Sequence, residues 1–257
     1  MPQKTIHLFA NWKMYLDYDE SNILANALAD MAKKLPPAVN LAVFPSALAL
    51  YPVGQALNDV GVKIGAQNAY WVDKGGYTGE TSMHMFKDAG CSFALVGHSE
   101  RRHIFGETNH DVRQKIEAAL AAGLLPVVCV GETLKERQAN KTEEVVEIQL
   151  RGAFDRMTVN DNARFIIAYE PVWAIGTGEA CAAVEAERMH GEIKKIVKAL
   201  LPSAEFSILY GGSVRPENVV EYIAGPLTDG VLIGNASAKL DSFSEIISKV
   251  SEYCAKK

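Results

Sequence analysis

A glutamate separates an apolar segment from a short loop in FIIAYEPVWAIGTG, residues 165–178. Glu170 ends a run typical of a buried strand and precedes Pro171, and a residue before proline favours extended backbone. The carboxylate is therefore expected at the mouth of the strand, where it could act as a general base. A single glutamate here would more commonly be a solvated strand-end residue. The glycine-bounded loop behind it favours the base, because such a loop is typical of a lid that excludes water.

A histidine follows another apolar run in FALVGHSERRHIFGE, residues 93–107. Ser99 is a suitable N-cap for a helix that begins near Glu100. His98 would then lie beside the positive end of the helix dipole, which favours a neutral ring. Such a ring could donate a hydrogen bond to a substrate carbonyl. A structural histidine and a metal ligand are the alternatives, but no second histidine or cysteine lies at ligand spacing, so we predict no metal site.

A lysine and an asparagine follow the first apolar run, in FANWKM. Lys13 could balance the negative charge of a phosphate or of an anionic intermediate. Asn11 could position the lysine or donate a hydrogen bond itself. The alternative for a single lysine is an apolar stem on the surface with the ammonium in solvent.

Two glycine-containing turns follow the last two apolar runs, in LYGGSVRPEN and VLIGNASAKL. Backbone N–H groups at such turns, together with the start of a short helix, bind phosphate in many barrels. Gly176 in the loop after Glu170 could add another N–H group. Together these features predict a phosphorylated substrate.

Eight short apolar runs alternate with longer amphipathic segments and would have to position these residues. The amphipathic segments include SNILANALADMAKKL, DVRQKIEAALAAG and EAERMHGEIKKIVKAL, and the runs are TIHLFA, NLAVF, VKIGA, FALVG, LPVVCV, RFIIAY, FSILY and GVLIG. Near-continuous apolar runs indicate parallel strands that are covered on both faces. We expect a closed (β/α)₈ TIM barrel in the α/β class, or alternatively an open doubly wound sheet.

The positions of the polar residues favour the closed barrel. In an open sheet, reactive side chains would gather only beside the switch point of the strand order. Here they follow six of the eight runs, at Asn11 and Lys13, Gln67 and Asn68, His98, Glu170, Gly212 and Ser213, and Gly234. These strand ends can converge only if the sheet closes. No linker interrupts the sequence, so residues 1–257 are expected to form a single barrel domain.

The composition narrows the class of protein further. Hydrophobic residues make up 48% of the 257 residues, which suffices for a large core. The net charge of −5 argues against a nucleic-acid partner. The four cysteines are scattered and favour a reducing compartment over disulfides or zinc. Neither a signal peptide nor an apolar run long enough to span a membrane is evident, so a cytoplasmic location without a membrane partner is expected.

Four motifs give the chain a family resemblance. NWKM, GHSERR, YEPVWAIGTG and YGGS occur in this order, and with them the chain resembles triosephosphate isomerases along nearly its whole length. The resemblance implies an isomerase that needs no cofactor and belongs to glycolysis and gluconeogenesis. It would interconvert dihydroxyacetone phosphate and D-glyceraldehyde 3-phosphate through an enediolate, beneath a closing lid.

The resemblance also implies roles for individual residues. Glu170 would be the base and His98 the electrophile, with Lys13 and Asn11 as electrostatic and binding groups and Glu100 as a supporting carboxylate near Lys13. Phosphate would be bound by N–H groups of Gly176, Ser213, Gly234 and Asn235. The lid would comprise Pro171, Val172, Trp173, Ala174, Ile175, Gly176, Thr177 and Gly178. Tyr210 and Ser213 would latch its closed form, and Glu132 would hold Trp173 in the open form.

The sequence departs from the family pattern at two places. Asn235 stands where a second glycine is usual, and asparagine tolerates a positive φ better than most residues. The lid ends in GEACAA, where Lys-Thr-Ala or a similar sequence is common in the family. Glu179 and Cys181 are therefore expected to alter lid kinetics, and whether the Cys181 thiol is reactive stays open.

The segment from Asn68 to Ser82 is too long for a simple connector. In the family this loop enters a neighbouring subunit, and the threonine matching Thr78 reaches that subunit's site. The resemblance therefore implies a homodimer, and a surface loop without a partner is the alternative.

Two other functions fit parts of the sequence. One is a different phosphosugar barrel, such as an isomerase or synthase of amino-acid biosynthesis, and the other is a non-catalytic protein that binds phosphoanions. The pairing of GHSERR with EPVWAIGTG favours the triose phosphate enzyme over the first. The presence of Glu170, His98 and Lys13 together argues against the second.

Overall fold

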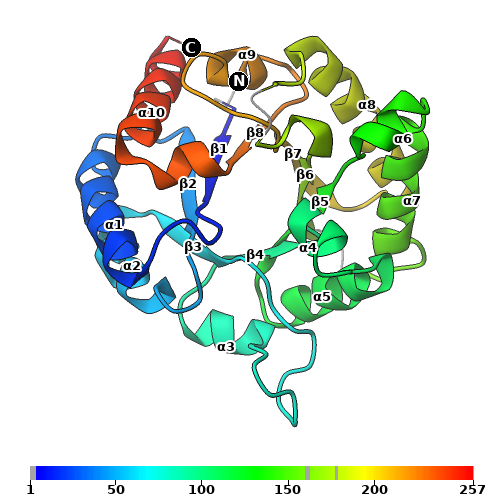
Figure 1. Ribbon diagram of the computed structural model, residues 1–257, viewed down its shortest axis with the longest axis horizontal. Helices are drawn as coiled ribbons and strands as arrows, with labels where there is room; N and C mark the ends of the chain where they lie inside the picture. Colours follow the sequence, from blue (N-terminus) through cyan, green and yellow to red (C-terminus); the bar gives the residue numbers. More distant parts are fainter. Residues whose placement is uncertain (1–3, 160–162, 177–178, 257) are drawn as a thin grey trace.

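The strands of the protein close into one parallel barrel in chain order (Figure 1). The computed structural model describes residues 4–159, 163–176 and 179–256. The predicted apolar runs correspond to β1 Ile6–Asn11, β2 Val39–Phe44, β3 Lys63–Ala66, β4 Phe93–Val96, β5 Leu125–Val130, β6 Arg164–Tyr169, β7 Glu205–Tyr210 and β8 Gly230–Ile233. Pairing of β1 with β8 closes the ring, for example at Ala10 and Ile233. The predicted closed barrel is confirmed, and the open sheet is excluded.

Helices surround the barrel (Figure 1). They are α1 Tyr18–Ala32, α2 Leu50–Leu57, α3 Met83–Asp88, α4 Ser99–His103, α5 Asn109–Ala121, α6 Leu134–Gln138, α7 Thr142–Phe154, α8 Ala183–Leu200, α9 Val219–Ile223 and α10 Leu240–Ala255. The three amphipathic segments named above fall in α1, α5 and α8. Short 3₁₀ turns follow at 58–60, 172–174 and 235–238.

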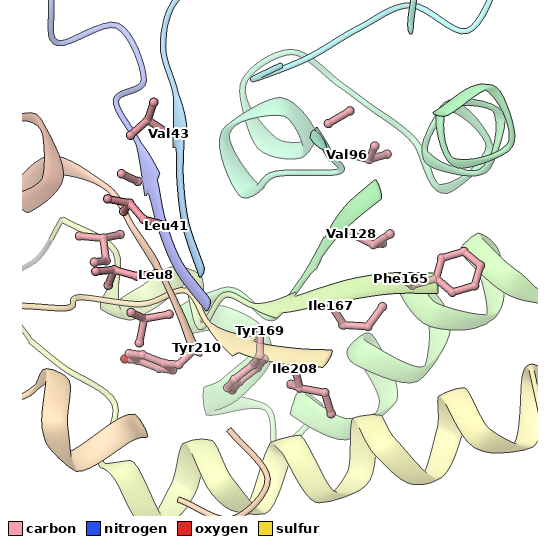
Figure 2. Close-up of a cluster of buried hydrophobic side chains, with 14 of the residues drawn as sticks. Leu8, Leu41, Val43, Val96, Val128, Phe165, Ile167, Tyr169, Ile208 and Tyr210 are labelled. Atoms are coloured by element: carbon pink, nitrogen blue, oxygen red, sulfur yellow. The ribbon is translucent and has the colours of Figure 1, made fainter. Parts of the chain in front are cut away.

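Alternation along the strands produces two apolar layers. One layer fills the barrel interior and contains Phe9, Phe44, Phe93, Leu95, Val127, Ile166, Ala168, Leu209 and Leu232. The residues between them, including Leu8, Val43, Val128, Ile167, Tyr169 and Tyr210, form the layer beneath the helices (Figure 2). Both faces of each strand are buried, which explains why the runs are apolar without strict alternation in polarity.

The same alternation determines the direction in which several site residues point. Side chains two residues apart along a strand lie on the same face. Asn11 follows the interior Phe9, and Glu170 follows the interior Ile166 and Ala168. By the same spacing Gly211 follows Leu209, and Gly234 follows Leu232. All four positions are therefore directed to the mouth formed by the carboxyl ends of the strands.

The segment between β3 and α3 projects beyond the ring of helices (Figure 1). Tyr70 forms a bridge with Ser82 and stacks on Trp71 with ring centroids 4.1 Å apart. The Tyr77 ring lies 4.9 Å from that of Tyr70. The projecting loop is thus folded upon itself. Among the described helices, none has the length and apolar composition that crossing a membrane requires.

Candidate active site at the mouth of the barrel

Glu170 lies buried at the end of β6 with both carboxylate oxygens in contact with the segment after β4. Its Oε1 is 3.2 Å from Nε2 of His98, and its Oε2 accepts a hydrogen bond of 2.8 Å from the N–H group of Ser99. Two glycines make room for it. A Cβ atom at Gly131 would lie 1.8 Å from the Glu170 carbonyl oxygen, and one at Gly211 would lie 2.9 Å from its Cγ. Neighbouring strand ends therefore require glycine for the carboxylate to occupy this position.

His98 is brought to the mouth by a turn at Gly97, whose φ is +71°. His98 itself is the N-cap of α4, since its Nδ1 accepts a hydrogen bond of 3.2 Å from the N–H group of Glu100. The prediction that Ser99 is the cap was wrong by one residue. Because Nδ1 accepts, the proton of the neutral ring lies on Nε2. This N–H group faces Glu170 and is the one that a substrate oxygen at the mouth would meet.

Lys13 has a positive φ of 50°, which is uncommon for a residue other than glycine. Its N–H group donates to Oδ1 of Asn11 at 3.0 Å, and its carbonyl accepts from Nε2 of Gln67 at 2.7 Å. Gln67 also donates to the Phe44 carbonyl at 2.9 Å. Strain of this kind costs on the order of 1–3 kcal/mol and persists where its surroundings enforce it. The lysine backbone is therefore fixed by the ends of β1 and β3.

The Lys13 ammonium pairs with Oε1 of Glu100 at 2.7 Å. This is the proximity that the family resemblance implied. The Lys13 side chain is only 12% exposed, so the alternative of an ammonium extended into solvent is excluded. The ion pair also joins the end of β1 to α4. The lysine and His98 thus lie on the same side of the mouth.

The glycine-containing turns after β7 and β8 border this group of charges. A Cβ atom at Gly234 would lie 3.1 Å from Cε of Lys13, which places the turn next to the ammonium stem. Nδ2 of Asn218 donates to the Ser213 carbonyl at 3.0 Å and holds the other turn. Asn235 begins the 3₁₀ turn at 235–238. Positive φ values occur at Lys13, Asn140 and Arg156 among the described non-glycine residues, so the left-handed backbone considered for Asn235 is not found.

The first part of the lid packs on the barrel wall through Trp173. Its Nε1 donates to Oε1 of Glu132 at 2.8 Å, and the Arg137 guanidinium lies 4.3 Å from its ring centroid. Glu132 is fully buried and also accepts from the Tyr169 hydroxyl at 3.1 Å. The contact that the resemblance assigned to the open lid is therefore present.

The lid residues after Trp173 differ from one another in their exposure to solvent. Ala174 is buried, Ile175 is half-buried, and Gly176 is exposed with a φ of 73°. Thr177 and Gly178 lie outside the described residues. Beyond them, the Cys181 N–H group donates to the Tyr210 hydroxyl at 3.3 Å. The Tyr210 and Glu132 contacts coexist here, and their assignment to the closed and open lid stays a prediction.

Several supporting residues were not assigned from the sequence. Buried Glu107 accepts from the Gly97 N–H group at 2.8 Å, and Nε of Arg102 donates to the Gly97 carbonyl at 2.7 Å. Gln149 bonds both the N–H and the carbonyl of Gly131, at 2.7 and 3.0 Å. Arg102 and Glu107 lie within the GHSERRHIFGE segment and could have been suspected there. Gln149 lies within an ordinary helix, and no sequence signal marks it.

The arrangement combines a carboxylate, a neutral imidazole and an ammonium at one strand-end face beside two glycine-containing turns. Such a group suits proton transfer next to a carbonyl in a phosphorylated substrate. The described residues contain no cluster of three or more His, Cys, Asp or Glu side chains that could hold a metal ion.

Comparison with known proteins gives one family. The model of that family, described as triosephosphate isomerase, matches residues 6–250. The triosephosphate isomerase of Rhodopirellula baltica is 41% identical over 247 residues, which cover 95% of this chain and 97% of the relative. That of Geotalea uraniireducens is 44% identical over 240 residues, covering 92% of this chain and 95% of the relative. By this similarity along nearly its full length, the chain belongs to the triosephosphate isomerase family.

Proposed function

We propose that the protein interconverts dihydroxyacetone phosphate and D-glyceraldehyde 3-phosphate in glycolysis and gluconeogenesis, with Glu170 as the group that moves the proton. The observation that carries this proposal is the buried Glu170 carboxylate 3.2 Å from the His98 Nε2, with the Lys13 ammonium held nearby through Glu100. The relatives named above bear the name of this isomerase. The glycine-containing turns, one beside Lys13 at Gly234 and one beside Glu170 at Gly211, support a phosphorylated substrate.

The proposed reaction moves protons and no net electrons. The Glu170 carboxylate removes a proton from the carbon next to the carbonyl, and the C–H electron pair forms the C=C bond of an enediolate. His98 Nε2–H and Lys13 stabilise the negative oxygen, with Asn11 holding the lysine. Protonated Glu170 then returns the proton to the neighbouring carbon, while His98 Nε2 gives its proton to the former carbonyl oxygen and takes one from the former hydroxyl oxygen. Because no electron acceptor is required, the proposal includes no cofactor and no metal.

Glu170 must leave its present contacts to do this. Both of its oxygens are engaged, one by His98 and the other by the Ser99 N–H group. We therefore interpret this carboxylate position as a resting one. On substrate binding, the substrate carbonyl oxygen would take the place of the Glu170 carboxylate beside His98. The carboxylate could then move toward the substrate carbon that loses its proton.

Phosphate binding is proposed to drive closure of the lid. The N–H groups of Gly176, Ser213, Gly234 and Asn235 would bind the phosphate, which does not react. Energy gained there can be used to close the lid over the reacting carbons. Closure excludes water and prevents the enediolate from expelling its phosphate. The coexisting Glu132 and Tyr210 contacts are the ones that would exchange during this motion.

A coupled assay with purified protein tests the proposed function. With D-glyceraldehyde 3-phosphate as substrate, we expect dihydroxyacetone phosphate to form, and we expect the same rate after treatment with a chelator. Activity on an amino-acid biosynthetic phosphosugar and none on triose phosphate would favour the rival barrel enzyme. Binding of 2-phosphoglycolate without turnover of triose phosphate would favour the non-catalytic protein.

We also propose that residues 1–257 act as one barrel domain within a homodimer. Large apolar side chains are exposed in the segments after β1 and β2 and in the projecting loop, at Met14 (95%), Leu48 (86%) and Tyr77 (44%). Monomers seldom leave many such side chains together in water. Thr78, in the projecting loop, would reach the site of the second subunit. Cys91, Cys129 and Cys181 form no disulfide within the part of the chain that the structure describes, which supports a cytoplasmic location.

The dimer can be tested by sedimentation. We expect a mass of twice 28.0 kDa, and we expect Thr78→Arg to give monomers with a large loss of kcat. A wild-type monomer with full activity would contradict the proposed dimer.

A further inference from the structure

Two tyrosines hold the backbone of the residue at which the lid rejoins the barrel. The N–H group of Cys181 donates to the Tyr210 hydroxyl at 3.3 Å, and its carbonyl accepts a bond of 2.6 Å from the Tyr222 hydroxyl. Tyr210 comes from β7, whereas Tyr222 comes from α9. Only Tyr210 was expected to contact the lid, and neither the sequence nor the comparisons assign a role to Tyr222.

The two rings support one another. They stack with centroids 3.9 Å apart and an interplanar angle of 15°, and both are buried. A Cβ atom at Gly212 would lie 2.2 Å from the Tyr210 hydroxyl, so the YGGS turn leaves that hydroxyl no room to shift toward it. The Tyr222 ring covers one face of the Tyr210 ring. Removal of its hydroxyl would leave this stacking intact.

The Cys181 carbonyl depends on the Tyr222 hydroxyl. Cys181 is buried and precedes α8, whose N-cap Ala182 has no side-chain capping bond. The first bonds of α8 are accepted by the Ala182 carbonyl, from Glu185 and Ala186. The preceding carbonyl thus lies outside the helical ladder. A buried carbonyl without a donor is unfavourable, and Tyr222 supplies the donor at this point.

We propose that Tyr222 is a positioning residue that fixes the C-terminal hinge of the lid through the Cys181 carbonyl. With this carbonyl held in both the open and the closed lid, the Tyr210 bond to the Cys181 N–H group re-forms at each closure, and the Gly176 N–H group returns to the same place in each turnover. This inference rests on the proposed isomerase activity and on the lid role of residues 171–178.

A loosened hinge would change the products of the reaction. If the lid reopens before the second proton transfer, the enediolate can expel its phosphate. The C–O bond to phosphate breaks with its electron pair leaving on the phosphate, the enediolate electrons form the new double bond, and the product tautomerises to 2-oxopropanal. One triose phosphate then gives one 2-oxopropanal and one inorganic phosphate, with no oxidant or reductant.

The experiment measures inorganic phosphate released per isomerisation turnover in wild type, Tyr222→Phe and Tyr253→Phe. Tyr253 is a matched control, because its hydroxyl also donates to a backbone carbonyl, that of Ile223 at 3.4 Å, and not to the carbonyl at the end of the lid. We expect this ratio to rise at least fivefold in Tyr222→Phe, with kcat about three- to tenfold lower. In Tyr253→Phe the ratio should stay within about 1.5-fold of wild type.

The ratio of phosphate release to isomerisation distinguishes a role of Tyr222 in the hinge from a role in stability alone. After the phosphate released without enzyme is subtracted, a variant that merely unfolds loses both reactions in proportion, so its ratio does not change. A Tyr222→Phe ratio equal to that of wild type would overturn the proposal, as would an equal rise in Tyr253→Phe. Failure of the isomerase function itself would be recognised differently, by the absence of isomerisation in the wild-type protein.

Discussion

Glu170→Asp is expected to lower kcat by a factor on the order of 10²–10³, with less than about a threefold change in KM. Aspartate keeps the charge and the ability to accept a proton, but it retracts the carboxylate by one methylene. A displacement of about 1 Å can cost a factor of 10² in rate, because proton transfer requires contact between the reacting atoms. Substrate binding depends mainly on the phosphate turns and Lys13, which this substitution leaves in place.

Steady-state kinetics in both reaction directions measures this effect. Glu205→Asp is a matched control, since Glu205 starts β7 at the opposite end of the barrel and pairs with Arg164 on the surface. We expect its kcat and KM to equal those of wild type. Equal proportional losses of kcat and affinity in Glu170→Asp would show that Glu170 binds substrate rather than moving its proton.

Lys13→Ala should weaken binding of 2-phosphoglycolate by a factor on the order of 10²–10³. At about 4 Å and an effective dielectric constant of about 20, a pair of opposite charges interacts with about 4 kcal/mol. Partial exposure reduces that value toward about 3–4 kcal/mol, which corresponds to the stated factor. The substitution also leaves the Glu100 carboxylate without its ammonium partner, which disfavours an anionic ligand further.

Isothermal titration calorimetry measures this loss. Alanine at position 13 would have to adopt the positive φ of Lys13, so Lys13→Gly is the companion variant that relieves the backbone strain. Both variants should lose affinity equally if the charge is responsible. Lys198→Ala serves as the control, because the Lys198 ammonium of the wild-type protein lies over the Phe206 ring, away from the mouth. An unchanged dissociation constant in both position-13 variants would contradict the proposed role.

The barrel was predictable from the sequence because its evidence is local and repeated. Each apolar run marks a strand that is buried on both faces, and the polar residue after the run marks the carboxyl end. Strand alternation then directs Asn11, Glu170 and Gly234 to the mouth without further information. These residues follow from the fold once the barrel closes.

The supporting contacts were not predictable in the same way. Gln67 bonds the Lys13 carbonyl across 54 residues of sequence, and Gln149 bonds both backbone groups of Gly131. Either glutamine would suit many other positions, and only closure of the barrel gives it this partner. Tyr222 resembles an ordinary core residue for the same reason. His98 is the N-cap in place of Ser99, because its Nδ1 accepts the Glu100 N–H group and Ser99 is already within α4.

A crystal structure of the complex with 2-phosphoglycolate would test the central claim most directly. The account predicts the ligand at the mouth of the barrel, with its phosphate on the turns at Ser213 and Gly234. A Glu170 oxygen, His98 Nε2 and Lys13 Nζ should all lie within about 3.5 Å of its two-carbon unit. A ligand bound elsewhere, or a Glu170 carboxylate still on Ser99 and out of reach of the ligand carbons, would contradict the assignment of the base.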